Sequence, residues 1–184
     1  TDYMADKTMF SCGRNKTLGR RTFIKQTAAA AAFVVVPRHV LGGEGNVAPS
    51  DKLNIASIGA GGMAATDIKS CATENIVALC DVDEKNASEM FNAYPKAARY
   101  KDFRVMLEKE NKKIDAVIVA TPDHIHAVAA MAAIKMGKHV YCEKPRTRTI
   151  WEAREMARVA AETGVATQMG TQGHAFEGTR AAAE

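Results

Sequence analysis

Short apolar runs alternate with amphipathic stretches along the chain from Leu53 onward. Ala116–Ala120 is apolar throughout, the pattern of a strand buried on both faces. Ile150–Thr163 has apolar residues at helical spacing and is followed by Gly164. By these criteria the strands are predicted at Leu53–Ile58, Ile76–Cys80, Ala116–Ala120, Val140–Cys142 and Val165–Met169. The helices are predicted at Met63–Cys71, Glu84–Ala93, Asp102–Glu110, His126–Met136 and Ile150–Thr163.

This alternation of strand and helix predicts an α/β fold with a doubly wound parallel sheet. Ligands bind to such sheets beyond the carboxyl ends of the strands. The glycines, carboxylates, histidines and lysine that stand out in this chain all follow predicted strands. We therefore expect one ligand site assembled from several strand ends.

Composition fits an ordinary globular protein, with 184 residues of which 47% are hydrophobic and 25% charged. The net charge of +4 comes from one end of the chain. Residues 1–50 hold 7 of the 25 Lys+Arg and 3 of the 21 Asp+Glu, which leaves 18 of each sign in residues 51–184. Because the body is neutral, no nucleic-acid partner is expected.

The basic N-terminal stretch resembles a twin-arginine (Tat) export signal. Arg20 and Arg21 precede an apolar run, Thr27–Val36, that Pro37 ends and that is short for a membrane span. We expect residues 1–48 to be signal peptide and linker, with the Tat machinery as partner and a periplasmic or extracytoplasmic location. Since no clear cleavage site follows, the leader could remain and tether the protein to the membrane. The alternative, an amphipathic core helix, lacks a polar face in this run.

Gly59-Ala60-Gly61-Gly62-Met63-Ala64 fits the dinucleotide-binding pattern G-x-G-x-x-G/A, between a predicted strand and a predicted helix. Gly59 allows a tight turn, Gly61 lets the backbone approach a pyrophosphate, and Ala64 keeps the helix close to the sheet. The helix N-terminus offers N–H groups to phosphates. The pattern predicts a Rossmann domain, and the alternative is a glycine turn in a flavodoxin-like domain without cofactor.

Asp81 ends the next predicted strand, where a carboxylate can accept hydrogen bonds from both adenosine ribose hydroxyls. A carboxylate there repels a 2′-phosphate, so NAD is favoured over NADP as the cofactor. The alternative is an ordinary surface carboxylate.

Two further motifs follow later strands. Thr121-Pro122-Asp123-His124-Ile125-His126 forms a turn that could lie along the nicotinamide ribose. His124 and His126 could instead bind a metal, but no third ligand is in view, so no metal site is predicted. Packing at the helix entry and polar contacts near the cofactor are the other two interpretations. In Glu143-Lys144-Pro145, the Lys144 ammonium could stabilise a developing alkoxide, or it could be a surface lysine in a turn.

In order and spacing, these four motifs together resemble the Gfo/Idh/MocA oxidoreductase family. The resemblance implies an NAD(P)-dependent dehydrogenase acting on CH–OH groups of sugars, polyols or related compounds. It implies a Rossmann domain over residues 49–170 and the start of a C-terminal α+β substrate domain at residues 171–184. The chain begins without Met and stops in a helix-like stretch, so we expect a fragment from which most of that second domain is missing.

The resemblance makes Lys144 the one catalytic residue in this chain, with a peptide bond to Pro145 that is often cis. The family's histidine base belongs to the second domain, and His174 comes too early to match it. Arg146 departs from the family, because an apolar residue commonly follows the Glu-Lys-Pro motif. The cofactor-binding residues predicted from motifs and resemblance are Gly59, Gly61, Gly62, Met63, Ala64, Asp81, Thr121, Pro122, His126, Glu143 and Lys144.

Two other functions stay open. One is an NAD-dependent glycoside hydrolase of the same superfamily, although that branch tends to lack the lysine at position 144. The other is a non-catalytic nucleotide-binding homologue. The resemblance also implies a homo-oligomer when full length. The four cysteines, Cys12, Cys71, Cys80 and Cys142, show no metal-ligand spacing and are expected to be structural thiols.

Overall fold

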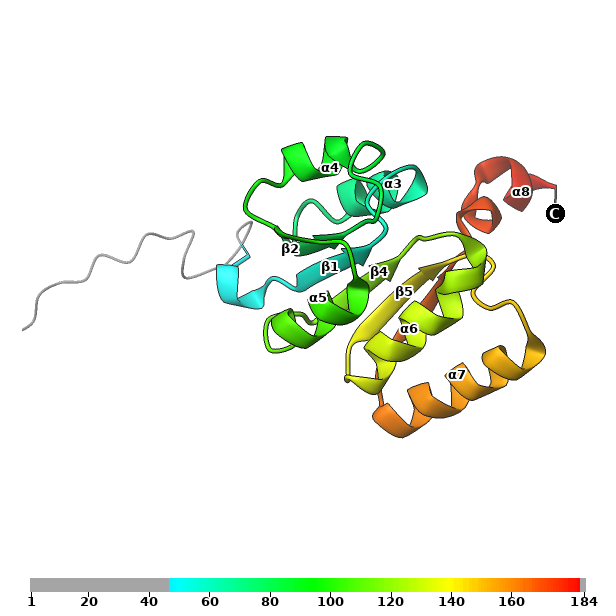
Figure 1. Cartoon of the computed structure of the whole chain (residues 1–184). Helices are drawn as coiled ribbons and strands as arrows, with labels where there is room; N and C mark the ends of the chain where they lie inside the picture. The colour runs from blue at the N-terminus through cyan, green and yellow to red at the C-terminus, as the bar shows by residue number, and fades with distance from the viewer. Residues whose placement is uncertain (1–46, 183–184) are drawn as a thin grey trace, which may run out of the picture.

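The computed structural model describes residues 47–182, which form a six-stranded sheet with helices on both faces (Figure 1). The twin-arginine motif and its apolar run lie outside the described residues. The strands are β1 (Asn54–Ile58), β2 (Asn75–Cys80), β3 (Ala98–Tyr100), β4 (Ala116–Val119), β5 (His139–Glu143) and β6 (Thr167–Gly170). The helices are α3 (Met63–Ser70), α4 (Ser88–Ala93), α5 (Phe103–Glu110), α6 (His126–Lys135), α7 (Ile150–Thr163) and α8 (Glu177–Ala181). Three short 3-10 helices are η1 (Pro49–Asp51), η2 (Asp123–Ile125) and η3 (Gln172–Ala175).

The strand order is β3-β2-β1-β4-β5-β6 and every neighbouring pair is parallel, which confirms the predicted doubly wound sheet. The chain moves outward from β1 to β3 and then returns to lay β4 beside β1. This reversal opens a crevice at the carboxyl ends of the strands, the usual ligand position in such folds.

The register brings the motifs to one edge of the sheet. Ile58 of β1 pairs with Cys80 of β2 and with Val119 of β4, and Val119 pairs with Cys142 of β5. The residues that follow these strands therefore leave the sheet side by side.

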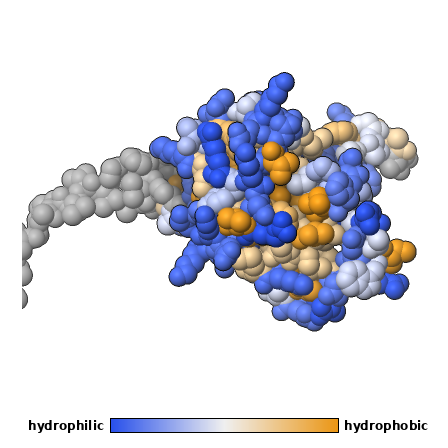
Figure 2. Space-filling view, viewed as in Figure 1, coloured by the Kyte–Doolittle hydropathy of each residue, from blue (hydrophilic) through white to orange (hydrophobic). Residues whose placement is uncertain are grey.

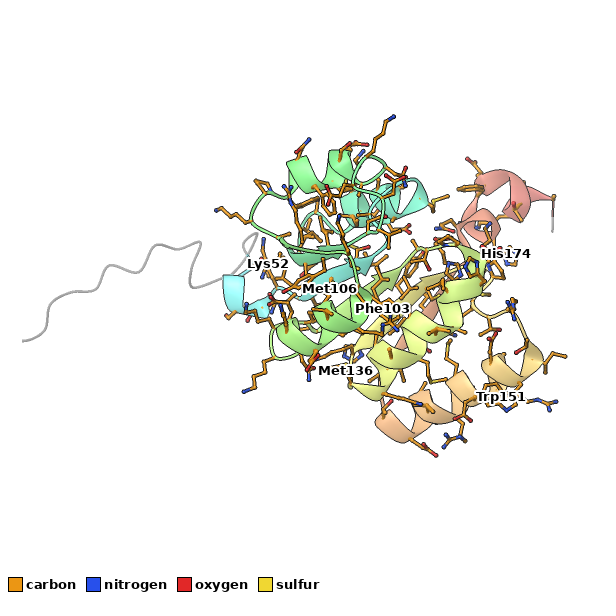
Figure 3. The ribbon with its side chains drawn as sticks, viewed as in Figure 1. Lys52, Phe103, Met106, Met136, Trp151 and His174 are labelled. Carbon is orange, nitrogen blue, oxygen red and sulfur yellow. The ribbon has the colours of Figure 1, made fainter. Side chains whose placement is uncertain are left out.

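Each face of the sheet has its own apolar core. On the α3 and α4 side, Ile68, Leu79 and Met90 are almost completely buried. On the other side, α5, α6 and α7 cover the sheet with residues such as Met106 and Ile134 (Figure 3). The surface in Figure 2 is mainly hydrophilic, with hydrophobic residues gathered near its centre.

Helix α7 has the bounds that its pattern predicts, because both of its ends are capped. Thr149 and Glu152 form a capping box, and Gly164 ends the helix in the left-handed conformation with φ 69°. The exposed Trp151 points away from the sheet (Figure 3). Within residues 47–182, no helix combines the length and apolarity that crossing a membrane requires.

Several element boundaries differ from the predictions. The helix predicted from Glu84 begins only at Ser88, because Asp83 Oδ1 accepts hydrogen bonds from the N–H groups of Lys85 and Asn86 and holds a turn there. The last strand begins at Thr167 rather than Val165. The three-residue strand β3 was not predicted.

Three cysteines lie in the described part of the chain, and all are free thiols. Burial raises the pKa of Cys80 and of Cys142 to about 12, so neither forms a thiolate at neutral pH. Cys71 is partly exposed, and its pKa is also raised by burial. These features fit the expected structural role; Cys12 lies outside the described residues.

Candidate functional site

The glycine turn after β1 depends on the missing side chain of Gly59. Its φ is 95°, and a Cβ placed on it would lie 2.3 Å from the backbone oxygen of Ala120. The Gly59 N–H donates to the Cys80 carbonyl at 2.8 Å, and Ser57 Oγ donates to the Gly59 carbonyl at 2.6 Å. The turn is thus pressed between the ends of β2 and β4, and only glycine fits.

The two following glycines meet different surroundings. A Cβ on Gly61 would lie 2.2 Å from Asn86 Nδ2, whereas a Cβ on Gly62, with φ 55°, would have no atom within 4 Å. Helix α3 then begins at Met63 without a side-chain cap, and Ala64 is fully buried against the sheet. The uncapped N–H groups of this helix can therefore face an anion such as a pyrophosphate.

The Asp81 carboxylate is fixed by two backbone groups. The N–H of Ala60 donates to Asp81 Oδ2 at 2.8 Å, and the N–H of Asp83 donates to Oδ1 at 2.9 Å. Each carboxylate oxygen retains a second acceptor position, which suits the two hydroxyls of a ribose.

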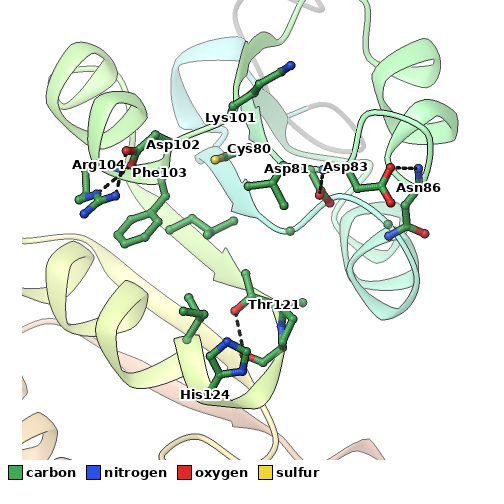
Figure 4. A pocket seen from close by; sticks show the side chains of 17 residues that line it. Cys80, Asp81, Asp83, Asn86, Lys101, Asp102, Phe103, Arg104, Thr121 and His124 are labelled. Carbon is green, nitrogen blue, oxygen red and sulfur yellow. Dashed lines mark hydrogen bonds and ion pairs between the residues drawn. The ribbon is translucent and has the colours of Figure 1, made fainter.

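A cleft of about 610 Å³ opens at the ends of β1, β2 and β4 (Figure 4). In Figure 4, Asp81 and Thr121 lie on opposite sides of it. Its volume is typical of a small-molecule or cofactor site. Residues that line it include Gly59, Gly61, Asp81, Val82, Asn86, Lys101, Phe103, Thr121, Pro122 and His124.

A smaller pocket of about 150 Å³ joins the glycine turn to the two later motifs. Its lining residues are Met63, Ala120, Thr121, Asp123, His126, Glu143 and Lys144. This pocket thus brings Met63, from the glycine turn after β1, together with Lys144, which follows β5. Lys144 is exposed at the rim of this pocket, and its peptide bond to Pro145 is cis.

His126 connects the two motif turns. Its side chain is 1% exposed, with Nδ1 2.7 Å from the Pro145 carbonyl oxygen and Nε2 2.7 Å from the Thr121 carbonyl oxygen. Because both ring nitrogens contact protein carbonyls, the role that follows from this geometry is to hold the turns together. A direct contact between His126 and the cofactor stays a prediction.

The two histidines of this motif do not form a metal site together. His124 is exposed and lines the larger cleft, whereas His126 is buried between the two turns. Among residues 47–182, no group of three or more His, Cys, Asp or Glu side chains is placed to hold a metal ion.

The Glu143 carboxylate lies against the end of β6. Glu143 is 4% exposed, and its Oε1 accepts hydrogen bonds from Tyr141 Oη, at 3.3 Å, and from Gln172 Nε2. A Cβ on Gly170 would lie 2.3 Å from this Oε1, so the end of β6 is closely fitted to the carboxylate.

The sequence predictions did not include Asn86, Phe103, Asp67 or Gln172. Asn86 and Phe103 line the cleft from segments after β2 and β3, and no motif marked them. Asp67 carried a usable signal, because an acidic residue on the apolar side of a helix is unusual. Gln172 lies just after the last predicted strand, where ligand-facing residues gather.

Comparison with known proteins places the fold and the motifs in one family. Residues 53–171 match the Gfo/Idh/MocA family model, described as an oxidoreductase family with an NAD-binding Rossmann fold. The D-glucoside 3-dehydrogenase of Escherichia coli K12 is 34% identical over 119 residues, which are 62% of this chain and 33% of that protein. The glucose-6-phosphate 3-dehydrogenase of Bacillus subtilis 168 is 34% identical over 122 residues, 63% of this chain and 33% of that protein.

Among solved structures, an NAD-binding oxidoreductase from Klebsiella pneumoniae aligns with a TM-score of 0.60 and 32% identity. The alignment covers 71% of this chain and 37% of that one. The chain thus spans about a third of the length of these relatives. The family match extends over well over half of the chain and includes all four motifs. This chain belongs to the Gfo/Idh/MocA oxidoreductase family and carries its NAD-binding Rossmann fold.

Proposed function

We propose that the full-length protein is an NAD-dependent dehydrogenase that oxidises a hydroxyl group of a sugar, polyol or related compound. The observation that carries this proposal is the small pocket that Lys144 shares with the glycine turn and with Thr121. Lys144 is exposed at this pocket, and Thr121, which shares it, is proposed to border the nicotinamide ribose. Two relatives in the same family are named as sugar dehydrogenases, which supports the substrate class.

The residues present fit an NAD molecule. The Gly59–Ala64 turn leaves room for a pyrophosphate because Gly62 has no neighbour within 4 Å of a would-be Cβ. Asp81 would hold the adenosine ribose, while Thr121 and Pro122 would border the nicotinamide ribose. We propose a preference for NAD over NADP, because the Asp81 carboxylate is fixed where a 2′-phosphate would meet it.

Lys144 would act on the oxygen of the substrate hydroxyl. NAD, when bound, supplies the hydride acceptor. As the hydroxyl proton leaves, the oxygen gains negative charge, and the Lys144 ammonium stabilises that charge through a hydrogen bond. His126 keeps the Lys144–Pro145 turn against the Thr121 turn through its two carbonyl contacts. We propose that the family's C-terminal α+β domain supplies the base and the homo-oligomer contacts.

The proposal is tested by steady-state kinetics of the full-length enzyme with NAD and a panel of sugars and polyols. Lys144→Ala is expected to lower turnover on the order of a hundredfold, with a much smaller change in NAD affinity. Lys112→Ala removes an exposed lysine far from the cleft and is the control. Near-normal turnover in Lys144→Ala would remove the catalytic assignment.

The same assay separates the alternatives. Glycoside cleavage without net NADH formation would identify a hydrolase, and NAD binding without turnover of any panel member would identify a binding protein. Lys144 favours the dehydrogenase, because the hydrolase branch of the superfamily tends to lack a lysine at this position.

We also propose export by the twin-arginine route, with the Rossmann domain folded before transport and with the leader either cleaved or kept as a membrane tether. The support is the Arg20-Arg21 pair ahead of the apolar run. Replacing both arginines with lysine is expected to retain the protein in the cytoplasm. Arg14→Lys, outside the motif, is the control, and an unchanged periplasmic yield of the double variant would refute the assignment.

A further inference from the structure

A third pocket, of about 720 Å³, lies between α3 and the η3–α8 segment that follows β6. It shares Met63 and Lys144 with the small pocket beside the predicted cofactor site. The two pockets therefore border the same lysine and could be reached by different parts of one ligand. A volume of this size suits a small molecule.

Asp67 lines this pocket from the middle of α3. Its side chain is only 9% exposed, and its Oδ2 has no hydrogen-bond partner among residues 47–182. Buried carboxylates are normally paired with a donor, because burial without one is costly. An unpartnered carboxylate oxygen on a pocket wall therefore indicates a site for a hydrogen-bond donor.

The charges around Asp67 favour a cationic donor. The groups that face it are Glu143 and Tyr141 from β5, Cys71 from its own helix and the neutral amide of Gln172, which hydrogen-bonds to the carboxylate; none of these carries a positive charge. Burial and the Glu143 charge raise the pKa of Asp67 to about 6, so it is ionised at neutral pH. The donors on Glu143 are the neutral Tyr141 and Gln172. Two buried negative charges thus lie close together, and Lys144, exposed at the rim, is the one basic residue among the described pocket residues.

The other residues that line this third pocket suit the ring of a sugar-like ligand. Met63, Ile118 and Phe176 contribute apolar surface. We propose that this pocket binds an ammonium group of the substrate at Asp67, so that the substrate is an amino sugar or an aminocyclitol. This inference rests on the proposed function and specifies its substrate class. The hydroxyl to be oxidised lies at the Lys144 end, and the amine lies at the Asp67 end.

The test uses the full-length enzyme with NAD and a matched set of glucose derivatives. The set comprises glucose, its 2-, 3- and 6-amino analogues and the N-acetylated form of each amine. At least one amine is expected to exceed glucose tenfold or more in kcat/KM at pH 7.5. Its N-acetyl form, which has the same ring but no charge, is expected to lose that advantage. If no amine exceeds glucose, the inference is overturned.

A variant pair assigns the preference to Asp67. Asp67→Asn keeps the shape of the side chain but removes its charge, and it is expected to reduce the amine-to-glucose ratio tenfold or more. Glu177→Gln removes an exposed carboxylate from the nearby α8 and should leave the ratio unchanged. In the wild-type enzyme, the ratio should also fall as the pH drops below about 6, because protonated Asp67 no longer pairs with an ammonium. Because this pH measurement uses the wild-type enzyme, it does not depend on whether a variant folds.

Other results would overturn the inference. If Asp67→Asn lowers the melting temperature and leaves the amine preference unchanged, Asp67 pairs with a basic side chain of the protein instead of with a ligand. If the enzyme oxidises no sugar, the proposed function fails, and calorimetric titration of the amines in the presence of NAD decides the inference separately. Binding that is lost in Asp67→Asn would sustain the amine site, and absence of binding to the wild-type protein would refute it.

Discussion

The backbone N–H of Ala60 donates a 2.8 Å hydrogen bond to Asp81 Oδ2, which joins the glycine turn to the carboxylate that ends β2. The residues are 21 positions apart in the sequence, and the parallel pairing of β1 with β2 brings them together. The group proposed to hold the ribose is thus oriented by the turn proposed to hold the pyrophosphate. A substitution at Ala60 or Asp81 is therefore expected to affect the binding of both the ribose and the pyrophosphate.

Asp81→Asn is expected to weaken the preference for NAD over NADP. The amide keeps one oxygen that can accept from Ala60 but removes the negative charge that would repel a 2′-phosphate. At close range this repulsion is worth about 1–4 kcal/mol, so the ratio of NADP to NAD dissociation constants should fall on the order of tenfold or more. Titration of both cofactors measures it, with Glu108→Gln, which removes an exposed carboxylate from α5, as the control. An unchanged ratio would count against Asp81 as the selecting residue.

Gly59→Ala is expected to destabilise the protein strongly. The new Cβ would have to lie 2.3 Å from the Ala120 carbonyl oxygen in a backbone with φ 95°. Gly164→Ala is a matched control, because Gly164 also has a positive φ, of 69°, but no atom within 4 Å of a Cβ. The control should lose only about 1–2 kcal/mol of unfolding free energy for the left-handed conformation, and Gly59→Ala should lose clearly more. Equal losses in urea unfolding would show that the contact with Ala120 is not limiting.

The main strands and the cofactor motifs could be predicted from the sequence because they have strong local patterns. The apolar run at Ala116–Ala120 and the capped helix Ile150–Thr163 contain in their own residues what determines their structure. Strand β3 could not be found in this way, because three residues carry no periodicity and form a strand only by pairing with β2. The Asp83 turn that delays α4 similarly depends on a side-chain contact rather than on periodicity.

The roles of individual site residues are harder to predict from the sequence. The sequence marks His126 as a polar residue near the cofactor, but its two carbonyl partners belong to different loops that only the fold brings together. The pattern predicts only that Asp67 lies in a helix, and the interaction of its carboxylate with Glu143 of β5 arises from the fold. Local sequence patterns therefore predict where the candidate site lies, whereas contacts between distant segments decide what each side chain can do there.

Asp67 is also expected to make stability depend on pH. Its pKa is raised from 3.8 to about 6 in the folded protein, so the folded state holds this proton more tightly than the unfolded state. The contribution to stability is full below about pH 4 and is lost as the pH rises through about 6. In the absence of ligand, Asp67→Asn should therefore raise the melting temperature at pH 7.5 by a few degrees and have much less effect near pH 4. Thermal unfolding at both pH values tests this, and a lower melting temperature at pH 7.5 would show that the ionised Asp67 has a stabilising partner.

Replacement of His126 is expected to lower both the stability of the protein and its turnover number. Replacing His126 with Ala removes both contacts with the part-buried carbonyls of Thr121 and Pro145, and losing a hydrogen bond of this kind costs about 0.5–1.5 kcal/mol. More importantly, it frees the Lys144–Pro145 turn from the Thr121 turn, so the Lys144 ammonium loses its fixed position at the rim of the small pocket.

Because Lys144 is proposed to act mainly in the transition state, His126→Ala should lower kcat about tenfold or more, even at temperatures where the variant is fully folded. NAD affinity should change much less, since the Gly59–Ala64 turn and Asp81 do not contact the imidazole. Lys112→Ala, the exposed-lysine variant already used as a control, serves again here. In the double variant with Lys144→Ala, the His126 effect on kcat should nearly disappear, because the group that it positions is already absent. If the two losses were instead additive, His126 would act on turnover by a route that does not involve Lys144.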